Sequence, residues 1–218
     1  MSSETSTSAG HTGAPATRTV TVWYLEQTDP GDLSPARIPD TSSAIRIERA
    51  EVPSPEFSRF LYTAAGGDVT WTDRLPWTYA QWRAFLERPG VETWVAYDRG
   101  TPAGFIELNA AREDRTQQDQ REGNGEGAVE ISYFGLLPAF RGRGLGGHLL
   151  SFGTARAWDL AERWPGHPRT RRVWVHTCSD DGPHAMANYR GRGFRLYDTR
   201  TEEEPYTPAP GPWPGAQR

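Results

Sequence analysis

Residues 129–147 read VEISYFGLLPAFRGRGLGG and join an apolar segment to a run of glycines. The first nine, 129–137, are rich in β-branched and aromatic side chains, a composition that predicts a β-strand. From Leu145 to Arg163, apolar residues recur at the spacing of one helix face, which predicts a helix. The order of strand, glycine turn and helix therefore predicts a fold that mixes α and β elements.

The glycine turn, residues 141–147, has the properties of an anion site. Glycine lets backbone N–H groups converge without obstruction from a Cβ atom. The helix that follows adds unsatisfied N–H groups and the positive end of its dipole. Arg141 and Arg143 bring positive charge to the same place. The turn predicts a pyrophosphate site, although on spacing alone a purely structural turn stays open.

Two other phosphate motifs fit this turn less well. A P-loop needs a lysine, and all 24 basic residues of this chain are arginines. Gly142, Gly144 and Gly147 have the spacing of a dinucleotide fingerprint, which also needs an acidic residue at the end of the next strand. The next predicted strand ends instead at His176-Thr177. A second Arg-Gly-Arg-Gly, at 190–193, is interpreted as local turn chemistry.

The rest of the chain alternates predicted strands and helices. Strands are predicted at 20–25, 45–48, 93–97, 103–108, 172–177 and 194–197. Helices are predicted from Pro55, from a cap at Thr78 or a neighbouring residue, and over 183–190. Residues 98–101 predict a hairpin turn, and the polar, glycine-containing stretch 111–127 predicts a loop. We expect one domain over 18–204, a disordered N-terminal tail over 1–17, and a Pro-rich C-terminal tail over 205–218.

The composition limits the classes of function. The chain has 218 residues and a net charge of −4, which argues against general binding to nucleic acid or to an anionic membrane. Its lack of lysine excludes Schiff-base catalysis. A single cysteine, no apolar run long enough to span a membrane and no secretory signal predict a cytoplasmic protein. The Ala, Gly, Pro and Arg content is typical of a high-GC bacterial genome.

The glycine turn is similar to the R/Q-x-x-G-x-G/A signature of the GNAT superfamily of N-acetyltransferases, whose positions fall here on Arg141, Gly144 and Gly146. A second block, Ala185, Tyr189 and Gly193-Phe194, resembles the closing A-x-x-x-Y-x-x-x-G-F pattern of that family. The resemblance covers residues 129–197. It implies a mixed, largely antiparallel central sheet flanked by helices, with acetyl-CoA as co-substrate and no metal.

The resemblance also implies how the co-substrate is held. The main chain of Leu136 and Leu137 would bind the pantetheine arm, and Phe140, Arg141 and Arg143 would form the wall. The pyrophosphate would be held by the backbone amides of Arg141, Gly142, Arg143, Gly144, Leu145, Gly146 and Gly147.

Transfer of an acetyl group to an amine needs a base for the amine and an acid for the thiolate that leaves. Tyr189 occupies the tyrosine position of the family and is the candidate acid. Glu130 and Glu107 are alternative bases, and a water relay with no dedicated base is a third option. Because neighbouring residues of a strand alternate faces, we expect Glu130 to share a face with Ser132 and Phe134.

The acceptor is expected to be a small amine-bearing molecule. His176 and Trp77 are candidates to line its site, and packing is a more common role than nucleophilic attack for a lone cysteine such as Cys178. The sequence leaves open whether the protein forms a homodimer. The alternative function is a catalytically silent domain of the same fold that binds acyl-CoA as a sensor or scaffold.

Overall fold

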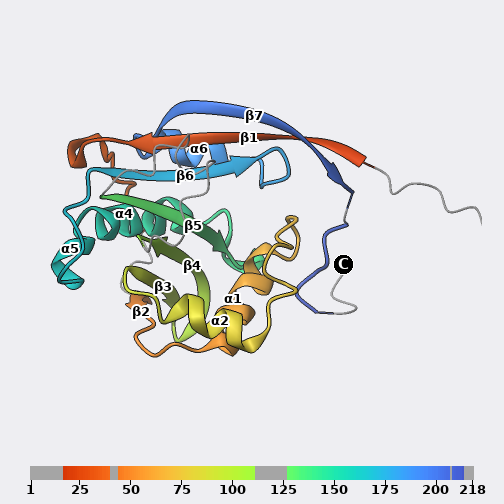
Figure 1. Ribbon diagram of the computed structural model, residues 1–218, viewed down its shortest axis with the longest axis horizontal. Coiled ribbons are helices and arrows are strands. Elements are labelled where there is room, and N and C mark those ends of the chain that lie inside the picture. Colours follow the sequence, from red (N-terminus) through yellow and green to blue (C-terminus); the bar gives the residue numbers. More distant parts are fainter. Residues whose placement is uncertain (1–16, 40–43, 111–126, 207, 214–218) are drawn as a thin grey trace, which may run out of the picture.

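The computed structural model describes residues 17–39, 44–110, 127–206 and 208–213. One seven-stranded sheet runs through it (Figure 1), in the order β2-β3-β4-β5-β6-β1-β7. The strands are β1 (Thr17–Gln27), β2 (Ile45–Arg49), β3 (Val91–Asp98), β4 (Thr101–Asn109), β5 (Ala128–Leu136), β6 (Arg172–Cys178) and β7 (Arg195–Pro205). The helices are α1 (Pro55–Gly66), α2 (Tyr79–Leu86), α4 (Leu145–Trp158), α5 (Leu160–Arg163) and α6 (Ala185–Gly191), with 3-10 turns η1 (Pro30–Asp32) and η3 (Pro138–Phe140). The predicted mixed, largely antiparallel sheet flanked by helices is confirmed.

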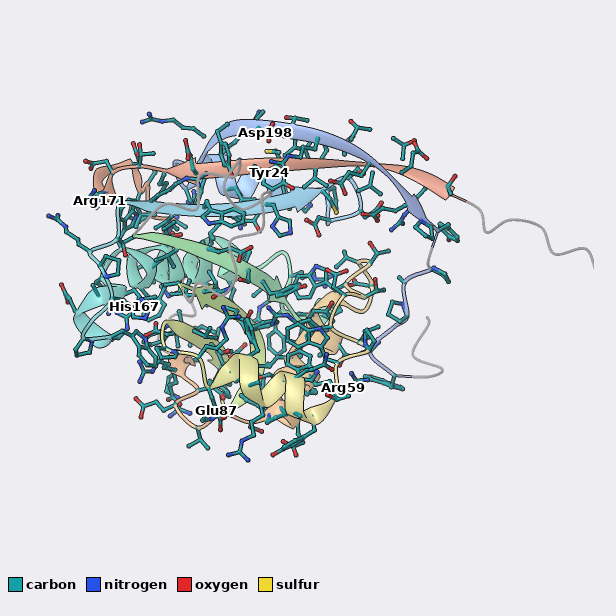
Figure 2. All side chains as sticks on the ribbon, viewed as in Figure 1. Tyr24, Arg59, Glu87, His167, Arg171 and Asp198 are labelled. Carbon is teal, nitrogen blue, oxygen red and sulfur yellow. The ribbon has the colours of Figure 1, made fainter. Side chains whose placement is uncertain are left out.

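Helices cover both faces of the sheet. Alternation along β4 sends Phe105 toward α1, where it packs with Leu61, and sends Ile106 into the larger core under α4. We call these two sides the α1 face and the α4 face. Figure 2 shows side chains filling the space between the sheet and α1 and α2. Among the described residues, no helix is long and apolar enough to cross a membrane.

The sheet opens between β5 and β6. Every pair of neighbouring strands is antiparallel except this one, which is parallel and pairs only from Ala128–Arg172 to Glu130–Trp174. Beyond those pairs, residues 131–136 of β5 and 175–178 of β6 diverge (Figure 1). We call this diverging part the splay. Strand backbone that loses its neighbour keeps hydrogen-bonding groups for another partner.

A β-bulge changes the face on which the later side chains of β5 lie. Glu107 pairs with Tyr133 and Leu108 pairs with Ile131, so Ser132 is an extra residue in the ladder. As a result Tyr133 packs on the α1 face, whereas Phe134 packs on the α4 face with Ile131. The expectation that Glu130 and Phe134 share a face is therefore wrong, because one inserted residue reverses the alternation.

Local signals set several element boundaries. Thr78 caps α2 with a capping box, as its sequence predicts, and the hairpin turn at 98–101 is confirmed. The predicted helix 145–163 is instead two helices, because Asp159 leaves the helical region at ψ 15°. The Asp159 carboxylate pairs with Arg156 in α4 and with Arg163 in α5, which holds the break in place.

The first and last strands of the described chain lie side by side in the sheet. β1 lies between β6 and β7 and pairs with both. β7 runs to Pro205, well beyond the predicted strand 194–197, because its polar residues Glu202–Glu204 are paired along β1 at the edge of the sheet. The predicted loop at 111–127 lies outside the described residues except for Gly127.

Candidate active site

The glycine turn presents an uncapped helix end. Gly142 and Gly144 both have positive φ, 75° and 77°, which side chains with a Cβ rarely adopt. Gly144 is the N-cap of α4, and no side chain caps that helix. A Cβ added at Gly142 would meet nothing within 4 Å. The first N–H groups of α4 therefore receive no side-chain cap, and they fit the pyrophosphate of a nucleotide co-substrate.

The arginines of this turn are held by the protein itself. The Arg141 guanidinium pairs with the Asp68 carboxylate and donates to the carbonyl oxygen of Ala65 (3.0 Å). The hydrogen bond from Arg141 lowers the pKa of Asp68. Arg143 pairs with Asp98 at 2.9 Å and lies over the ring of Phe140. Because carboxylates neutralise both arginines, anion binding here rests mainly on backbone N–H groups.

Some of the backbone hydrogen-bonding groups at the end of β5 already have partners within the protein. Leu137 donates its N–H to the Ala103 carbonyl (2.9 Å), and the Leu136 carbonyl accepts from Arg141 Nε (3.0 Å). The predicted pantetheine contacts of these two leucines would have to use other groups or displace Arg141. A Cβ on Gly146 would lie 3.6 Å from Leu136, so α4 approaches β5 closely there.

Arg192 is a neighbour of the turn that the sequence interpretation missed. A Cβ on Gly147 would lie 2.6 Å from Arg192 NH1, so this guanidinium lies against the first turn of α4. Its Nε donates to the Ser34 carbonyl (2.9 Å). The repeated Arg-Gly-Arg-Gly was the available signal, and folding brings its second copy beside the first.

Glu130 lies where the splay begins. It belongs to the last β5–β6 pair, and its side chain is 20% exposed. Ser132 Oγ, from the bulge, donates to Glu130 Oε2 at 2.9 Å, and His176 Nδ1 lies 3.7 Å from Oε1. Burial raises the pKa of the Glu130 carboxyl, although His176 and Ser132 oppose the shift. A raised pKa makes the carboxylate a better proton acceptor than an ordinary glutamate.

Glu107 has a different environment. Its carboxylate pairs with Arg74 through two contacts of 2.9 and 3.0 Å, and both side chains are buried. Aromatic rings surround the Arg74 guanidinium, at 4.2 to 5.7 Å from Phe85, Tyr133, Trp77 and Trp82. Trp77 thus packs against Arg74 and Trp82. A carboxylate held by a buried arginine is a weaker proton acceptor than one held by a hydroxyl.

Tyr189 lies on the opposite face of the sheet from Glu130. It is 6% exposed on α6, and its ring lies 6.2 Å from Phe134 and 6.1 Å from Phe194. Burial, and then the negative charge of Asp181, raise the pKa of its hydroxyl, so this group stays protonated at neutral pH. It can donate a proton at the α4 face of the splay, and it also closes the core.

The end of β6 supplies two more side chains. His176 is 46% exposed and lies on the same face as Glu130. Burial raises the pKa of Cys178 to about 11, so its sulfur is a protonated thiol at neutral pH and a poor nucleophile. In the part of the chain that the structure describes, no group of three or more His, Cys, Asp or Glu side chains is placed to hold a metal ion.

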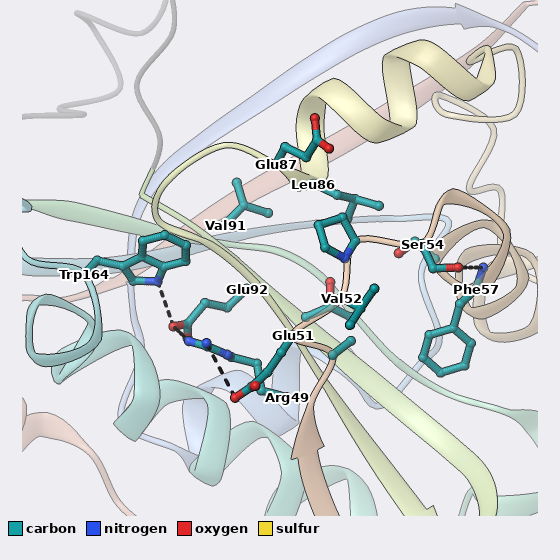
Figure 3. Close-up of a pocket in the computed structure, with 14 residues that line it drawn as sticks. Arg49, Glu51, Val52, Ser54, Phe57, Leu86, Glu87, Val91, Glu92 and Trp164 are labelled. Atoms are coloured by element: carbon teal, nitrogen blue, oxygen red, sulfur yellow. Dashed lines mark hydrogen bonds and ion pairs between the residues drawn. The ribbon is translucent and has the colours of Figure 1, made fainter.

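A cavity of about 200 Å³, whose lining includes no residue of the splay, lies at the N-terminal end of α1 (Figure 3). Glu92 lies on its wall between Trp164 and Arg49, and it accepts from Arg163 at 2.8 Å as well. Although burial acts to raise it, the pKa of Glu92 is lowered, since Arg163 and Trp94 donate to the carboxylate. The Glu92 carboxylate therefore has a structural role, because its hydrogen bonds from Arg163 and Trp164 hold the end of α5 against the sheet.

A family model described as the acetyltransferase (GNAT) family matches residues 51–194, most of the chain. The chain belongs to the GNAT family. The match includes the glycine turn, Glu130 and Tyr189, but it includes no part of β1, β2 or β7. No curated protein matches the chain in sequence.

Solved structures agree with this GNAT assignment at the level of fold. A GCN5-related N-acetyltransferase from Kribbella flavida has a TM-score of 0.54 and 18% identity, over 86% of this chain and 58% of that one. Another, from Sphaerobacter thermophilus, has a TM-score of 0.55 and 17% identity, over 88% and 52%. The GNAT fold is thus confirmed, and this chain spans less than two thirds of the length of either structure.

Proposed function

We propose that this protein is an N-acetyltransferase that moves an acetyl group from acetyl-CoA to a primary amine by direct attack. The observation that carries the proposal is the uncapped start of α4 beside a strand that has lost its neighbour. The first feature suits a pyrophosphate, and the second leaves backbone groups for an extended arm. The two structural neighbours, both described as GCN5-related N-acetyltransferases, agree with the proposal.

Two proton carriers lie on opposite faces of the splay. Glu130 accepts the proton of the amine on the α1 face, and Tyr189 donates a proton to the departing thiolate on the α4 face. The C–N bond forms as the C–S bond breaks, giving an amide and the free thiol, and bulk solvent resets both side chains. Direct attack needs no covalent enzyme intermediate, which agrees with the protonated state of Cys178.

Glu130 is favoured over Glu107 as the base by its partners. Ser132 and His176 contact Glu130 without supplying the fixed charge that Arg74 supplies to Glu107. His176 lies at 3.7 Å from Glu130 and is exposed, so it contributes to the acceptor site. Trp77 contributes indirectly, because it packs against the Arg74 guanidinium.

The alternative is a domain that binds acyl-CoA without turnover. The deep burial of Tyr189 favours it, because a buried tyrosine with a raised pKa is a weak acid. A panel of primary amines, assayed for thiol release from acetyl-CoA, separates the two functions. Amine-stimulated release supports the enzyme, whereas tight coenzyme A binding without release from any amine supports the sensor.

Tyr189→Phe tests the role of the acid in the same assay. Phenylalanine keeps the ring contacts with Phe134 and Phe194, so the melting temperature and the Kd for coenzyme A should stay close to wild type. Turnover should fall about 10²-fold if the hydroxyl gives the proton. Unchanged turnover would reduce Tyr189 to a packing role.

A further inference from the structure

The wide end of the splay is spanned by contacts between its two sides. On the β5 side, the loop after α1 packs over the strand, since a Cβ on Gly135 would lie 3.1 Å from both Ala65 and Trp71. Thr70 in that loop donates to Asp180 Oδ2 at 3.3 Å, and Asp180 follows β6. This hydrogen bond therefore joins the two diverging strands beyond the point where their backbone pairing ends.

A second crossing lies next to the first. After β7 the chain turns toward the end of α1 (Figure 1), where Gly211 donates its N–H to the Gly67 carbonyl at 2.8 Å. The approach is close, because a Cβ on Gly67 would lie 2.7 Å from the Gly211 carbonyl carbon. The described segment 208–213 thus docks on the α1 side, although a sequence of this kind predicts a free tail.

Arg18 links the two crossings. It pairs with Asp180 at 2.6 Å and lies over the ring of Tyr206, 5.8 Å from its centroid. Arg18 belongs to β1 and Tyr206 follows β7, so Arg18 contacts both the β6 side and the chain that leads to the segment 208–213. We call Arg18, Thr70, Asp180 and the segment 208–213 on Gly67 the clasp.

We propose that the clasp closes the wide end of the splay and restricts the acceptor to a slender primary amine that enters end-on from the α1 face. This inference rests on the proposed function. The inner limit of the entrance is the Glu130–His176 contact and its outer limit is Thr70–Asp180. Asp180 is four positions after His176, so the entrance is at most about 14 Å long.

The rim of this entrance suits a cationic amine. Asp73 accepts a hydrogen bond from the Tyr133 hydroxyl at 3.3 Å, and Glu130 accepts from Ser132. Both of these carboxylates accept from neutral hydroxyl groups, whereas Asp180 in the clasp pairs with the charged Arg18 guanidinium. An ammonium group is drawn to such a rim, and it passes one proton through Glu130 to bulk solvent before the neutral amine attacks.

The test compares two primary amines with the same –CH₂NH₂ head and different girth, hexylamine and adamantylmethylamine. Three changes open the clasp: Asp180→Ala, Gly211→Val, and a chain that ends at Pro205. Gly211 has a φ of 72°, which valine does not adopt without strain. Two matched controls leave the clasp intact: Gly166→Val, at another positive-φ glycine with open space around it, and a chain that ends at Trp213.

We expect the clasp variants to raise the ratio of kcat/KM for adamantylmethylamine over hexylamine by about tenfold, and both controls to keep the wild-type ratio. An unchanged ratio in all three variants, with thiol release intact, overturns the clasp and leaves the proposed function standing. The absence of thiol release with every amine overturns the proposed function instead.

The clasp also has a readout that needs no turnover. The Gly211 amide should exchange with deuterium slowly in wild type, and at least about tenfold faster in Asp180→Ala, which frees Arg18 and the segment it holds. A Gly211 amide that exchanges at the rate of an open chain in wild type would contradict the inference.

Discussion

Two carboxylates at the same end of the sheet differ in what their partners do to their charge. Glu107 is buried with Arg74, which fixes the negative charge. Glu130 is held by Ser132 and faces His176, and burial raises its pKa. The sequence left the two glutamates as alternative bases, with Glu130 ahead because of its place in the strand. It could not show that Arg74, from the loop between α1 and α2, pairs with Glu107, because that contact forms only when the chain folds.

Glu130→Gln should remove the base without unfolding the protein. We expect kcat/KM to fall by about 10²- to 10⁴-fold. The wild-type pH profile should have an acidic limb above about pH 4.3, the ordinary value for glutamate, since the pKa of Glu130 is raised, and the variant should lack this limb. Ser132→Ala is the matched control: losing a hydrogen bond to the charged form should move the limb to higher pH and keep the maximal rate.

The same shift fixes the sign of the effect of Glu130 on stability. A carboxyl with a raised pKa in the folded state stabilises the fold below its unfolded pKa, and that contribution is lost as pH rises through the folded pKa. At pH 7 Glu130→Gln should therefore melt at or above the wild-type temperature. A clear drop in melting temperature at pH 7 would show that Glu130 is structural.

Glu107→Gln should act mainly on stability. Removing one partner of a buried ion pair leaves the Arg74 charge uncompensated and costs about 3–5 kcal/mol. Denaturant unfolding measures the loss. The double variant Arg74→Met with Glu107→Leu should recover most of it, because both charges are gone. If Glu107→Gln instead keeps its stability and loses the acidic limb of the pH profile, Glu107 is the base.

At the scale of elements, the sequence predicted features that depend on adjacent residues, but it did not predict how strands and helices pair with one another. The cap at Thr78 and the turn at 98–101 depend on adjacent residues, so the sequence predicted both. The bulge at Ser132 depends on the register between β4 and β5, and alternation alone placed Phe134 on the wrong face. The break at Asp159 depends on arginines one turn away on either side.

The start of α4 gives the prediction that belongs to this scale. Gly144→Val forces a β-branched residue into a left-handed conformation, at φ 77°, where the helix begins. Gly166→Val places the same residue at φ 99° in the loop before β6. Both should lose about 1–2 kcal/mol of stability, but only Gly144→Val should weaken coenzyme A binding, by about tenfold in calorimetry. Equal affinity of the two variants for coenzyme A would show that the glycine turn is not part of the coenzyme A site.

At the scale of the whole molecule, three strands of the sheet, β1, β2 and β7, lie outside the region that matches the family. β1 lies between β6 and β7, and nothing in the order of elements along the chain shows that the first strand joins the last two. The sequence predicted the approximate bounds of each strand. It could not predict that β1 pairs with β6 and β7, because every residue pair that β1 makes is long-range.

A chain that begins at residue 44 should therefore fail to fold, although it contains the whole match to the family model. It lacks Val20, Val22, Tyr24 and Leu25, all buried, and burial of each side chain contributes about 1.5–3 kcal/mol. Their sum, about 6–12 kcal/mol, matches the entire stability of a typical domain, about 5–15 kcal/mol. Loss of β1 also removes the backbone hydrogen-bond partners of β6 and β7.

A chain that begins at Thr17 keeps these contacts and should melt within a few degrees of the full chain. Circular dichroism and thermal melts of both compare them directly, and a cooperative melt of the shorter chain would show that the fold is complete without β1.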